Sequence, residues 1–268
     1  MSQKDVMPVA FFGHGSPMTT LTRNRYTEVW RAMADSMPRP KAIVAVSAHW
    51  YTRGIGVTSN ARQKTIHDFY GFPQALFDIE YPAPGDPELA ARVQSLLAPL
   101  DVHLAESWGL DHGTWSVLLH AYPGAPIPVI QLSIDANQPA SFHYELGSRL
   151  APLREEGILI VGSGNVVHNL RLMRHNETEP PYDWALRFEA NVREALLARD
   201  HDALINIDRL GQDAMLSVPT PEHYLPLLYV VGLQREGETV SIPVDGIELG
   251  SLSMLSAVIG GTRSHGPA

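Results

Sequence analysis

The stretch "VAFFGHGSPM" (Val9–Met18) begins as an apolar run and stops abruptly at a glycine, a histidine and a second glycine. A short apolar run bounded by glycine and proline is typical of a strand that is buried on both faces of a sheet. The first side chain with acid–base or metal-binding chemistry after this strand is His14. We therefore expect a buried strand whose end presents His14 to a site.

Two further stretches repeat this order of residues. "KAIVAVSAHW" (41–50) is a second continuous apolar strand with His49 at its end. "GILIVGSGNVVH" (157–168) has an apolar strand, a Gly-Ser-Gly turn and then His168. Because glycine adopts backbone conformations that other residues avoid, we expect the glycines beside these histidines to bend the chain and let substrate approach. These glycines are Gly13, Gly15, Gly162 and Gly164.

Amphipathic stretches separate the apolar ones, and together they predict alternating strands and helices. Helices are expected at 21–37, 86–100, 111–123, 138–156, 183–199, 201–210 and 220–233, with caps at Asp86 and Thr220. Further strands are expected at 54–59 and 127–134 and in a β-rich tail, 239–255. This pattern predicts an α/β single-domain sandwich, 1–268, with a central mostly parallel or mixed sheet covered by helices on both faces.

The composition excludes several classes of protein. With 44% hydrophobic residues among 268, the chain can bury a large core. The net charge of -9 and the lack of basic clusters argue against nucleic-acid and membrane partners. The absence of cysteine confines any metal site to nitrogen and oxygen ligands. No apolar stretch approaches the roughly 20 residues of a membrane span, so we expect a cytoplasmic protein.

Twelve histidines stand out against this background. Ligands of α/β proteins bind where the carboxyl ends of parallel strands meet, so His14, His49 and His168 are expected at one edge of the sheet. The alternative for any single one is an ordinary hydrogen-bonded loop residue. Informative contexts also surround His67, His112 and His223. Structural or surface roles are expected for His103, His120, His143, His175, His201 and His265.

Two glycine-containing motifs do not fit other known chemistries. "GSGNVVH" (162–168) lacks the G-x-G-x-x-G spacing and the lysine of a phosphate-binding loop. "GHGSP" (13–17) is not the G-x-S-x-G elbow of a serine hydrolase. Nucleotide binding and a nucleophilic Ser16 or Ser163 therefore have little support.

Six motifs occur in a characteristic order: "GHGSP", "SAHW", "IHDFYGFP", "DHGTW", "GSGNVVHNL" and "PEHYLPLL". In this order the chain resembles the class III (LigB-type) extradiol ring-cleaving dioxygenases, most closely their DOPA 4,5-dioxygenase branch. The resemblance runs from about Val9 into the β-rich tail. It implies an α/β sandwich and a non-haem Fe(II) enzyme that inserts both atoms of O2 into a catechol such as DOPA, cleaving the ring beside the two hydroxyls.

The resemblance also implies a role for each histidine. His14, His49 and His223 match the metal ligands. His168 matches the acid–base histidine beside the metal, and His112 matches a second active-site histidine that contacts substrate or dioxygen. The implied partners are a small-molecule catechol and O2, and the oligomeric state is not implied.

The third ligand position departs from the best-known pattern. Many extradiol enzymes hold iron with two histidines and one carboxylate, whereas the third position here is His223. The adjacent Glu222 could supply a carboxylate instead. Three histidines also suit zinc, so Zn(II) is expected as a possible occupant of the purified protein.

Two other functions use the same histidines. A zinc-dependent hydrolase would need a general-base carboxylate, for which Glu222 or Asp111 could serve. A non-catalytic metal-binding relative needs none. O2 consumption with a catechol separates the dioxygenase from both.

Aromatic and basic side chains near the motifs are candidates for binding the substrate. The ring pocket could be lined by Phe69, Tyr70, Trp115 and Tyr224, each of which could equally be core. Candidates for a substrate carboxylate are Arg171 and Arg174.

Overall fold

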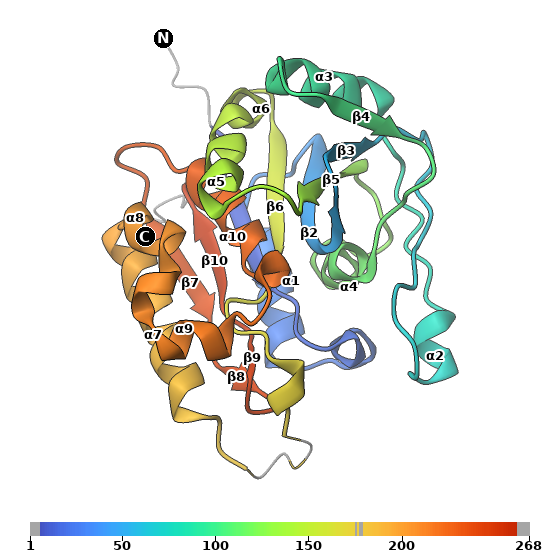
Figure 1. Cartoon of the computed structure of the whole chain (residues 1–268). Helices are drawn as coiled ribbons and strands as arrows, with labels where there is room; N and C mark the ends of the chain where they lie inside the picture. Colours follow the sequence, from blue (N-terminus) through green and yellow to red (C-terminus); the bar gives the residue numbers. More distant parts are fainter. Residues whose placement is uncertain (1–5, 175, 177–178, 262–268) are drawn as a thin grey trace, which may run out of the picture.

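A computed structural model describes residues 6–174, 176 and 179–261. Its main feature is an eight-stranded sheet with the order β4-β3-β5-β2-β6-β1-β10-β7 (Figure 1). The strands are β1 (Val9–Gly13), β2 (Ala42–Thr52), β3 (Ile55–Thr58), β4 (Val102–Ala105), β5 (Val129–Asp135), β6 (Ile158–Gly164), β7 (Val240–Val244) and β10 (Ser256–Ile259). A small hairpin is formed by β8 (Ile247–Glu248) and β9 (Leu252–Ser253).

The centre of the sheet is parallel, and antiparallel pairs flank it on both sides, beyond which the edge strand β4 again pairs parallel with β3. Strands β5, β2, β6 and β1 run parallel to one another. Strand β10 is antiparallel to β1 and to β7, and β3 is antiparallel to β5. The expected mixed sheet is confirmed, and the parallel centre brings the carboxyl ends of β1, β2 and β6 to one edge.

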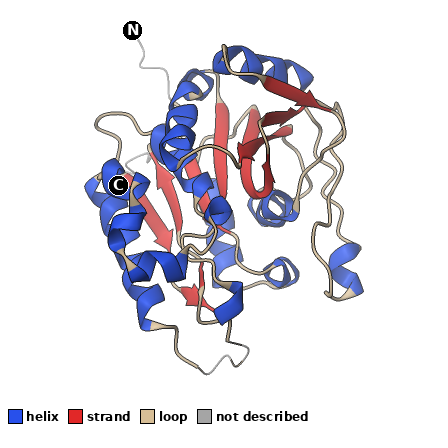
Figure 2. Ribbon diagram, in the orientation of Figure 1, coloured by secondary structure: helices blue, strands red, loops and turns tan. Residues whose placement is uncertain are grey.

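Helices cover both faces of the sheet, as Figure 2 shows. They are α1 (Arg25–Ser36), α2 (Gln74–Phe77), α3 (Pro87–Leu97), α4 (His112–Ala121), α5 (Ala140–Arg149), α6 (Ala151–Glu155), α7 (Asp183–Ala198), α8 (His201–Ile205), α9 (Gln212–Ser217) and α10 (Leu225–Gly232). Short 3-10 helices are η1 (Pro17–Leu21), η2 (Leu170–Leu172), η3 (Ile207–Leu210) and η4 (Pro221–His223).

The sheet has a hydrophobic core on each face, and a single strand contributes to both because its successive side chains point to opposite sides. Phe11 of β1 packs in the core that α3, α5, α7 and α10 share. The next residue, Phe12, packs in the core formed with α1 and α4, beside Trp30 and Trp115. This alternation confirms the expected sandwich. The single-domain boundary, 1–268, stays a prediction.

The glycines of β6 are strand residues, so the expected Gly-Ser-Gly turn is wrong. A Cβ at Gly162 would lie 2.5 Å from the carbonyl oxygen of Pro226, and one at Gly164 would lie 2.1 Å from that of His223. Both are glycine because the chain entering α10 passes directly against β6. Gly13 likewise ends a strand, whereas Gly15 has the positive φ of 65° expected of a turn.

Of the two predicted helix caps, one is confirmed and one is wrong, and three predicted helices are divided. The cap at Asp86 is confirmed, since its side chain accepts from the Leu89 N–H. Thr220 does not cap backbone, because its hydroxyl donates to Glu222. The expected helix 138–156 is divided into α5 and α6, where Pro152 lacks an N–H. The expected helices 201–210 and 220–233 each divide into an α-helix and a 3-10 turn.

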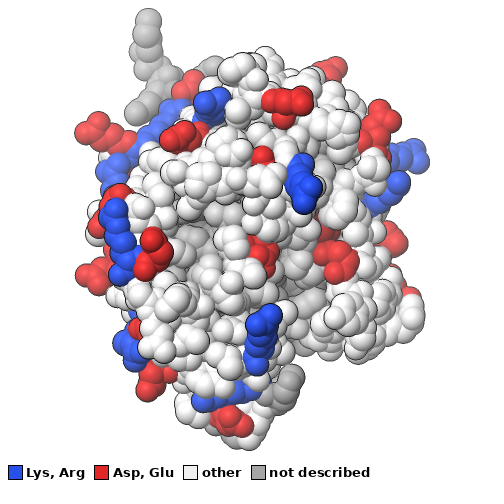
Figure 3. Space-filling model, viewed as in Figure 1, with Lys and Arg blue, Asp and Glu red and all other residues white. Residues whose placement is uncertain are grey.

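The surface carries charges of both signs. On the face in Figure 3, basic side chains are interspersed with acidic ones. Within the described ranges, we find no helix with the length and apolar character that a membrane crossing requires.

Candidate metal centre

Five histidines line one cavity of about 410 Å³ at the carboxyl edge of the parallel strands. They are His14, His49, His112, His168 and His223. The remaining lining residues are Gly15, Ser16, Pro17, Asp68, Phe69, Tyr70, Phe72, Leu170, Met173 and Leu252. Every histidine with an expected metal or catalytic role is therefore in this cavity.

Different elements deliver these side chains. His14 directly follows β1, and His49 lies near the end of β2, where the pairing with β5 shifts register. His112 is the first residue of α4. His223 ends η4, and His168 lies in the loop after β6, where it forms an isolated bridge with Leu252.

The tautomer of His14 follows from its partner. Nδ1 of His14 lies 3.0 Å from the Ser163 hydroxyl oxygen, and that hydroxyl donates to the Gly113 carbonyl at 2.5 Å. Because the serine proton is already used, the oxygen accepts from Nδ1–H of His14. Nε2 of His14 is left with a lone pair.

His49 and His112 share one carboxylate. Oδ2 of Asp68 lies 3.2 Å from Nδ1 of His49 and 2.9 Å from Nδ1 of His112. A carboxylate accepts hydrogen bonds, so His112 donates from Nδ1. The same negative charge, 3.2 Å from Nδ1 of His49, favours a proton on that nitrogen too, which leaves a lone pair on Nε2 of each ring. Sequence reasoning missed Asp68, although it lies in the "IHDFYGFP" motif.

His223 is held by its neighbour in sequence. Its Nδ1 lies 3.2 Å from Oε1 of Glu222. Its Nε2 is buried and has no hydrogen-bond partner. A histidine whose Nδ1 is fixed by a carboxylate and whose Nε2 is free has the arrangement typical of metal ligands. Glu222 thus serves to orient His223.

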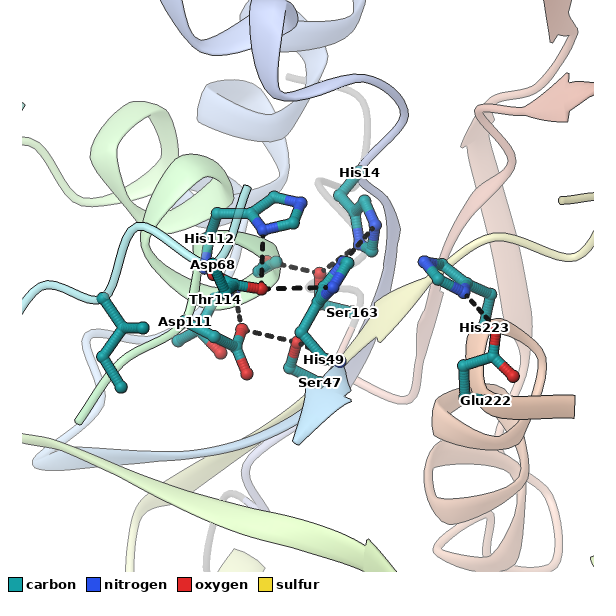
Figure 4. Close-up of polar contacts among 12 residues, drawn as sticks. His14, Ser47, His49, Asp68, Asp111, His112, Thr114, Ser163, Glu222 and His223 are labelled. Carbon is teal, nitrogen blue, oxygen red and sulfur yellow. Dashed lines mark hydrogen bonds and ion pairs between the residues drawn. The ribbon is translucent and has the colours of Figure 1, made fainter. Parts of the chain in front are cut away.

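The free nitrogens face one another. Nε2 of His14 lies 3.3 Å from Nε2 of His49. Figure 4 shows the His223 ring to the right of this pair and the His112 ring to its left. Two lone pairs at that distance repel unless a cation lies between them. Nitrogens that are each about 2.1 Å from one metal ion lie about 3.0 to 3.4 Å apart, so the donor set fits a metal.

Two separate sets of potential ligands are compact. The ligand atoms of His14, His49 and His112 all lie within 4.8 Å of one another, as do those of His168, Glu222 and His223. The His223 ring centroid lies 5.4 Å from that of His14 and 5.0 Å from that of His49. The geometry therefore allows either His112 or His223 as a third ligand beside His14 and His49.

Burial keeps these imidazoles neutral. It lowers the pKa of His14, His49 and His223 well below the ordinary value, and neighbouring imidazoles lower the pKa further. Burial and then His112 lower the pKa of His168 to about 4. Burial alone would raise the pKa of Asp68, but the hydrogen bond from the His112 side chain and the electrostatic influence of the His112 and His49 rings outweigh burial and lower it. Neutral imidazole is the form that binds metal.

The two carboxylates that could serve as a general base, Asp111 and Glu222, are engaged by other groups. Asp111 does not line the cavity: it caps α4 and accepts from Ser47 at 2.6 Å and from the Thr114 N–H at 3.1 Å. The proposed role as a base beside a metal therefore does not fit it. Glu222, the other candidate base, is engaged by Thr220 and His223.

The aromatic candidates divide into wall and core. Phe69 and Tyr70 line the cavity together with Phe72, which sequence reasoning missed. Trp115 and Tyr224 are core residues whose polar atoms donate to backbone carbonyls.

The basic candidates lie outside the cavity wall. Arg171 is exposed, and Arg174 stacks on Tyr182 and pairs with Glu179. Neither is among the residues described as lining the cavity.

The remaining histidines have structural surroundings where they are described. His67 contacts the Ile79 carbonyl oxygen at 3.0 Å and packs among aromatic rings. Other partners hold His120, His143 and His201. His103 is exposed. His175 and His265 lie outside the described residues.

Comparisons with known proteins show the family of the chain. Residues 13–248 match the family described as the catalytic LigB subunit of aromatic ring-opening dioxygenase. The chain is 54% identical over 259 residues to the 4,5-DOPA dioxygenase extradiol of Escherichia coli (strain K12), covering 95% of each chain. It is 36% identical over 252 residues to the 4,5-DOPA dioxygenase extradiol of Beta vulgaris, covering 90% of this chain and 92% of that one.

A solved structure agrees as well. The crystal structure of an uncharacterized protein from Escherichia coli K12 superposes with a TM-score of 0.84 and 49% identity, over 95% of this chain and 100% of that chain. The fold and the histidine-lined cavity define an enzyme that opens aromatic rings with dioxygen. The chain belongs to the LigB family of extradiol ring-cleaving dioxygenases. Enzymes of this family use a non-haem metal and act on a small aromatic molecule and O2.

Proposed function

We propose that the chain cleaves 4-substituted catechols such as DOPA at the 4,5 position, with Fe(II) held by His14, His49 and His223. The observation that carries the metal site is the 3.3 Å approach of two Nε2 lone pairs, those of His14 and His49. The buried Nε2 of His223, which lacks a hydrogen-bond partner, supplies the third ligand. The substrate follows from relatives that are named 4,5-DOPA dioxygenase extradiol.

The donor set also determines the charge of the site. Bound Fe(II) supplies open coordination positions and the electrons that allow a catechol to react with dioxygen. Three neutral imidazoles leave the full charge of the ion uncompensated, which favours binding of the catechol as an anion. The same ligands suit Zn(II), so zinc is the expected competitor in purified protein.

His168 and His112 carry the proton transfers in this proposal. The His168 ring stacks on the His223 ring with centroids 3.4 Å apart, which puts a neutral imidazole beside the ligand. A neutral imidazole can accept the proton that a catechol hydroxyl loses on binding. His112 has its Nδ1 held by Asp68, so Nε2 is free to contact substrate or dioxygen.

The cavity wall favours an aromatic ring. Phe69, Phe72 and Leu252 supply apolar surface beside the histidines. Tyr70, also in the wall, is 92% exposed and marks the mouth. Because no lysine or arginine is among the described lining residues, we expect the charged side chain of DOPA to extend toward the mouth and solvent.

Reconstitution tests the proposal against its rivals. Metal-free protein is loaded anaerobically with Fe(II) or with Zn(II) and is then exposed to air with a panel of catechols. The proposal expects O2 uptake and a ring-opened product with Fe(II), and much less with Zn(II). A zinc hydrolase and a non-catalytic metal-binding relative would consume no O2 with either metal. A cytoplasmic location stays a prediction from the sequence.

A further inference from the structure

One carboxylate contacts two of the five cavity histidines. Asp68 lies in the segment 66–73, which follows a short bridge between Thr65 and Leu110. Its Oδ2 accepts from Nδ1 of His112 at 2.9 Å and lies 3.2 Å from Nδ1 of His49, an ion-pair contact. Its Oδ1 accepts from the backbone N–H of His112 at 2.8 Å. The Asp68 side chain is only 18% exposed.

We propose that Asp68 is a positioning residue that fixes the tautomers of a metal ligand, His49, and of a substrate-facing histidine, His112, through one oxygen atom. The roles of these two histidines rest on the proposed function. The contacts of Asp68 do not.

The geometry explains why one oxygen suffices. The rings of His49 and His112 have centroids 3.8 Å apart, with planes inclined by 46°. Both Nδ1 atoms lie within 3.2 Å of Oδ2 of Asp68, and its negative charge favours a proton on each of them. Each Nε2 is then an acceptor that faces the cavity, as metal binding and proton transfer require.

The second oxygen of Asp68 keeps the carboxylate in place. It accepts from the backbone N–H of the first residue of α4, a group that has no partner within the helix. A negative charge at a helix N-terminus is also favourable. The carboxylate is thus tied to the same helix that carries His112.

The other two proposed ligands, His14 and His223, have separate partners. Ser163 accepts from His14, and Glu222 accepts from His223. Loss of either partner disturbs one ring, whereas loss of Asp68 disturbs two. This difference distinguishes coupling through Asp68 from ordinary support of a ligand.

The test begins with metal-free protein that carries isotope-labelled histidine. Nitrogen NMR reports which ring nitrogen holds the proton. We expect His49 and His112 to be Nδ1–H tautomers in the wild type. Asp68→Asn replaces the carboxylate with an amide. If the amide oxygen keeps the hydrogen bond from the backbone N–H of His112, the NH2 group faces Nδ1 of both rings. An NH2 group donates, so the ring protons should move to Nε2. Asp68→Ala, which only removes the acceptor, is the second variant.

Metal affinity and turnover give the further readouts. Replacing a residue that orients a ligand typically weakens metal binding by about 10- to 100-fold, and we expect this for Zn(II) with both Asp68 variants. With Fe(II) added to saturation, kcat with DOPA should stay reduced because His112 is no longer oriented. Glu222→Gln should weaken metal binding but leave the His112 tautomer unchanged.

Asp78→Asn is the matched control. It removes the same charge from an exposed aspartate of the neighbouring segment, whose side chain accepts from Gln74. This variant should match the wild type in tautomers, Zn(II) affinity and turnover.

Specific results would overturn the role of Asp68. They are Nε2–H tautomers in the wild type, unchanged tautomers and Zn(II) affinity in both Asp68 variants, or weakened Zn(II) binding with full kcat at saturating Fe(II). An inactive wild type would instead refute the proposed function, because the tautomer and Zn(II) measurements need no turnover.

Discussion

The imidazole of His168 lies parallel to that of His223, with ring centroids 3.4 Å apart and planes inclined by only 7°. The two rings come from the loop after β6 and from η4, which are far apart in the sequence. The contact puts a neutral imidazole directly beside a proposed ligand. It also raises the question of which of the two rings binds metal.

Replacing His168 separates the two roles. We expect His168→Ala to retain metal and to bind catechol, while kcat falls by roughly 10²- to 10⁴-fold, the range typical of a lost proton transfer. Metal content by atomic absorption and single-turnover kinetics check this. Metal loss as severe as that in His223→Ala would make His168 a ligand.

Comparison of His223 with His112 decides the third ligand. His14→Ala, His49→Ala and His223→Ala should each lose most of the metal while remaining folded, because their side chains line the cavity and are not part of the two hydrophobic cores. His112→Ala should keep its metal but turn over slowly. If His112→Ala loses metal and His223→Ala retains it, the compact set of His14, His49 and His112 is the correct one.

Tyr70 at the cavity mouth should affect substrate binding without affecting stability. Because it is 92% exposed, Tyr70→Ala should change the free energy of unfolding by less than about 0.5 kcal/mol. It should raise KM for 4-substituted catechols more than for unsubstituted catechol. Tyr70→Phe, which keeps the ring, should resemble the wild type. Equal KM values for all three proteins would remove Tyr70 from the substrate contacts.

His143, in α5, makes stability depend on pH. Burial lowers its pKa from 6.5 to about 4, so the folded protein holds it neutral while the unfolded chain takes up a proton below pH 6.5. The unfolded state then binds more protons, and stability is lost as the pH falls from 6.5 toward 4. A histidine of this kind lowers the free energy of unfolding by about 1.4 kcal/mol for each pH unit of that fall.

Urea unfolding of metal-free protein at about pH 7 and about pH 5 measures this loss. His143→Gln should reduce the difference in unfolding free energy between the two pH values by about 2 kcal/mol. His103→Gln, at an exposed position in β4, should leave the difference unchanged. A difference in His143→Gln as large as in the wild type would contradict the assignment.

The sequence predicted those parts of the site that depend on the sheet alone. His14 and His49 sit at the ends of buried apolar strands, and parallel strands bring such ends to one edge. The order of the motifs indicated His112 and His223. Their positions beside the strand ends depend on how α4 and η4 pack against the sheet. Periodicity alone did not indicate them.

What the sequence could not predict depends on contacts between distant segments. Gly164 resembles a turn residue, but its small size is needed because the His223 carbonyl would lie 2.1 Å from a Cβ. Asp68 lies in an irregular loop, and only its distances to His49 and His112 reveal its place. Trp115 and Phe69 have similar aromatic character, yet only Phe69 is among the residues described as lining the cavity.

Oxygen stoichiometry tests the central claim most directly. Protein reconstituted anaerobically with one equivalent of Fe(II) is mixed with a limiting amount of DOPA, and O2 uptake is followed with an electrode while the product is identified by mass spectrometry. The account predicts one O2 consumed per DOPA and a ring-opened product that retains both oxygen atoms. DOPA recovered unchanged with no O2 uptake, or oxidised to a quinone without ring opening, would contradict it.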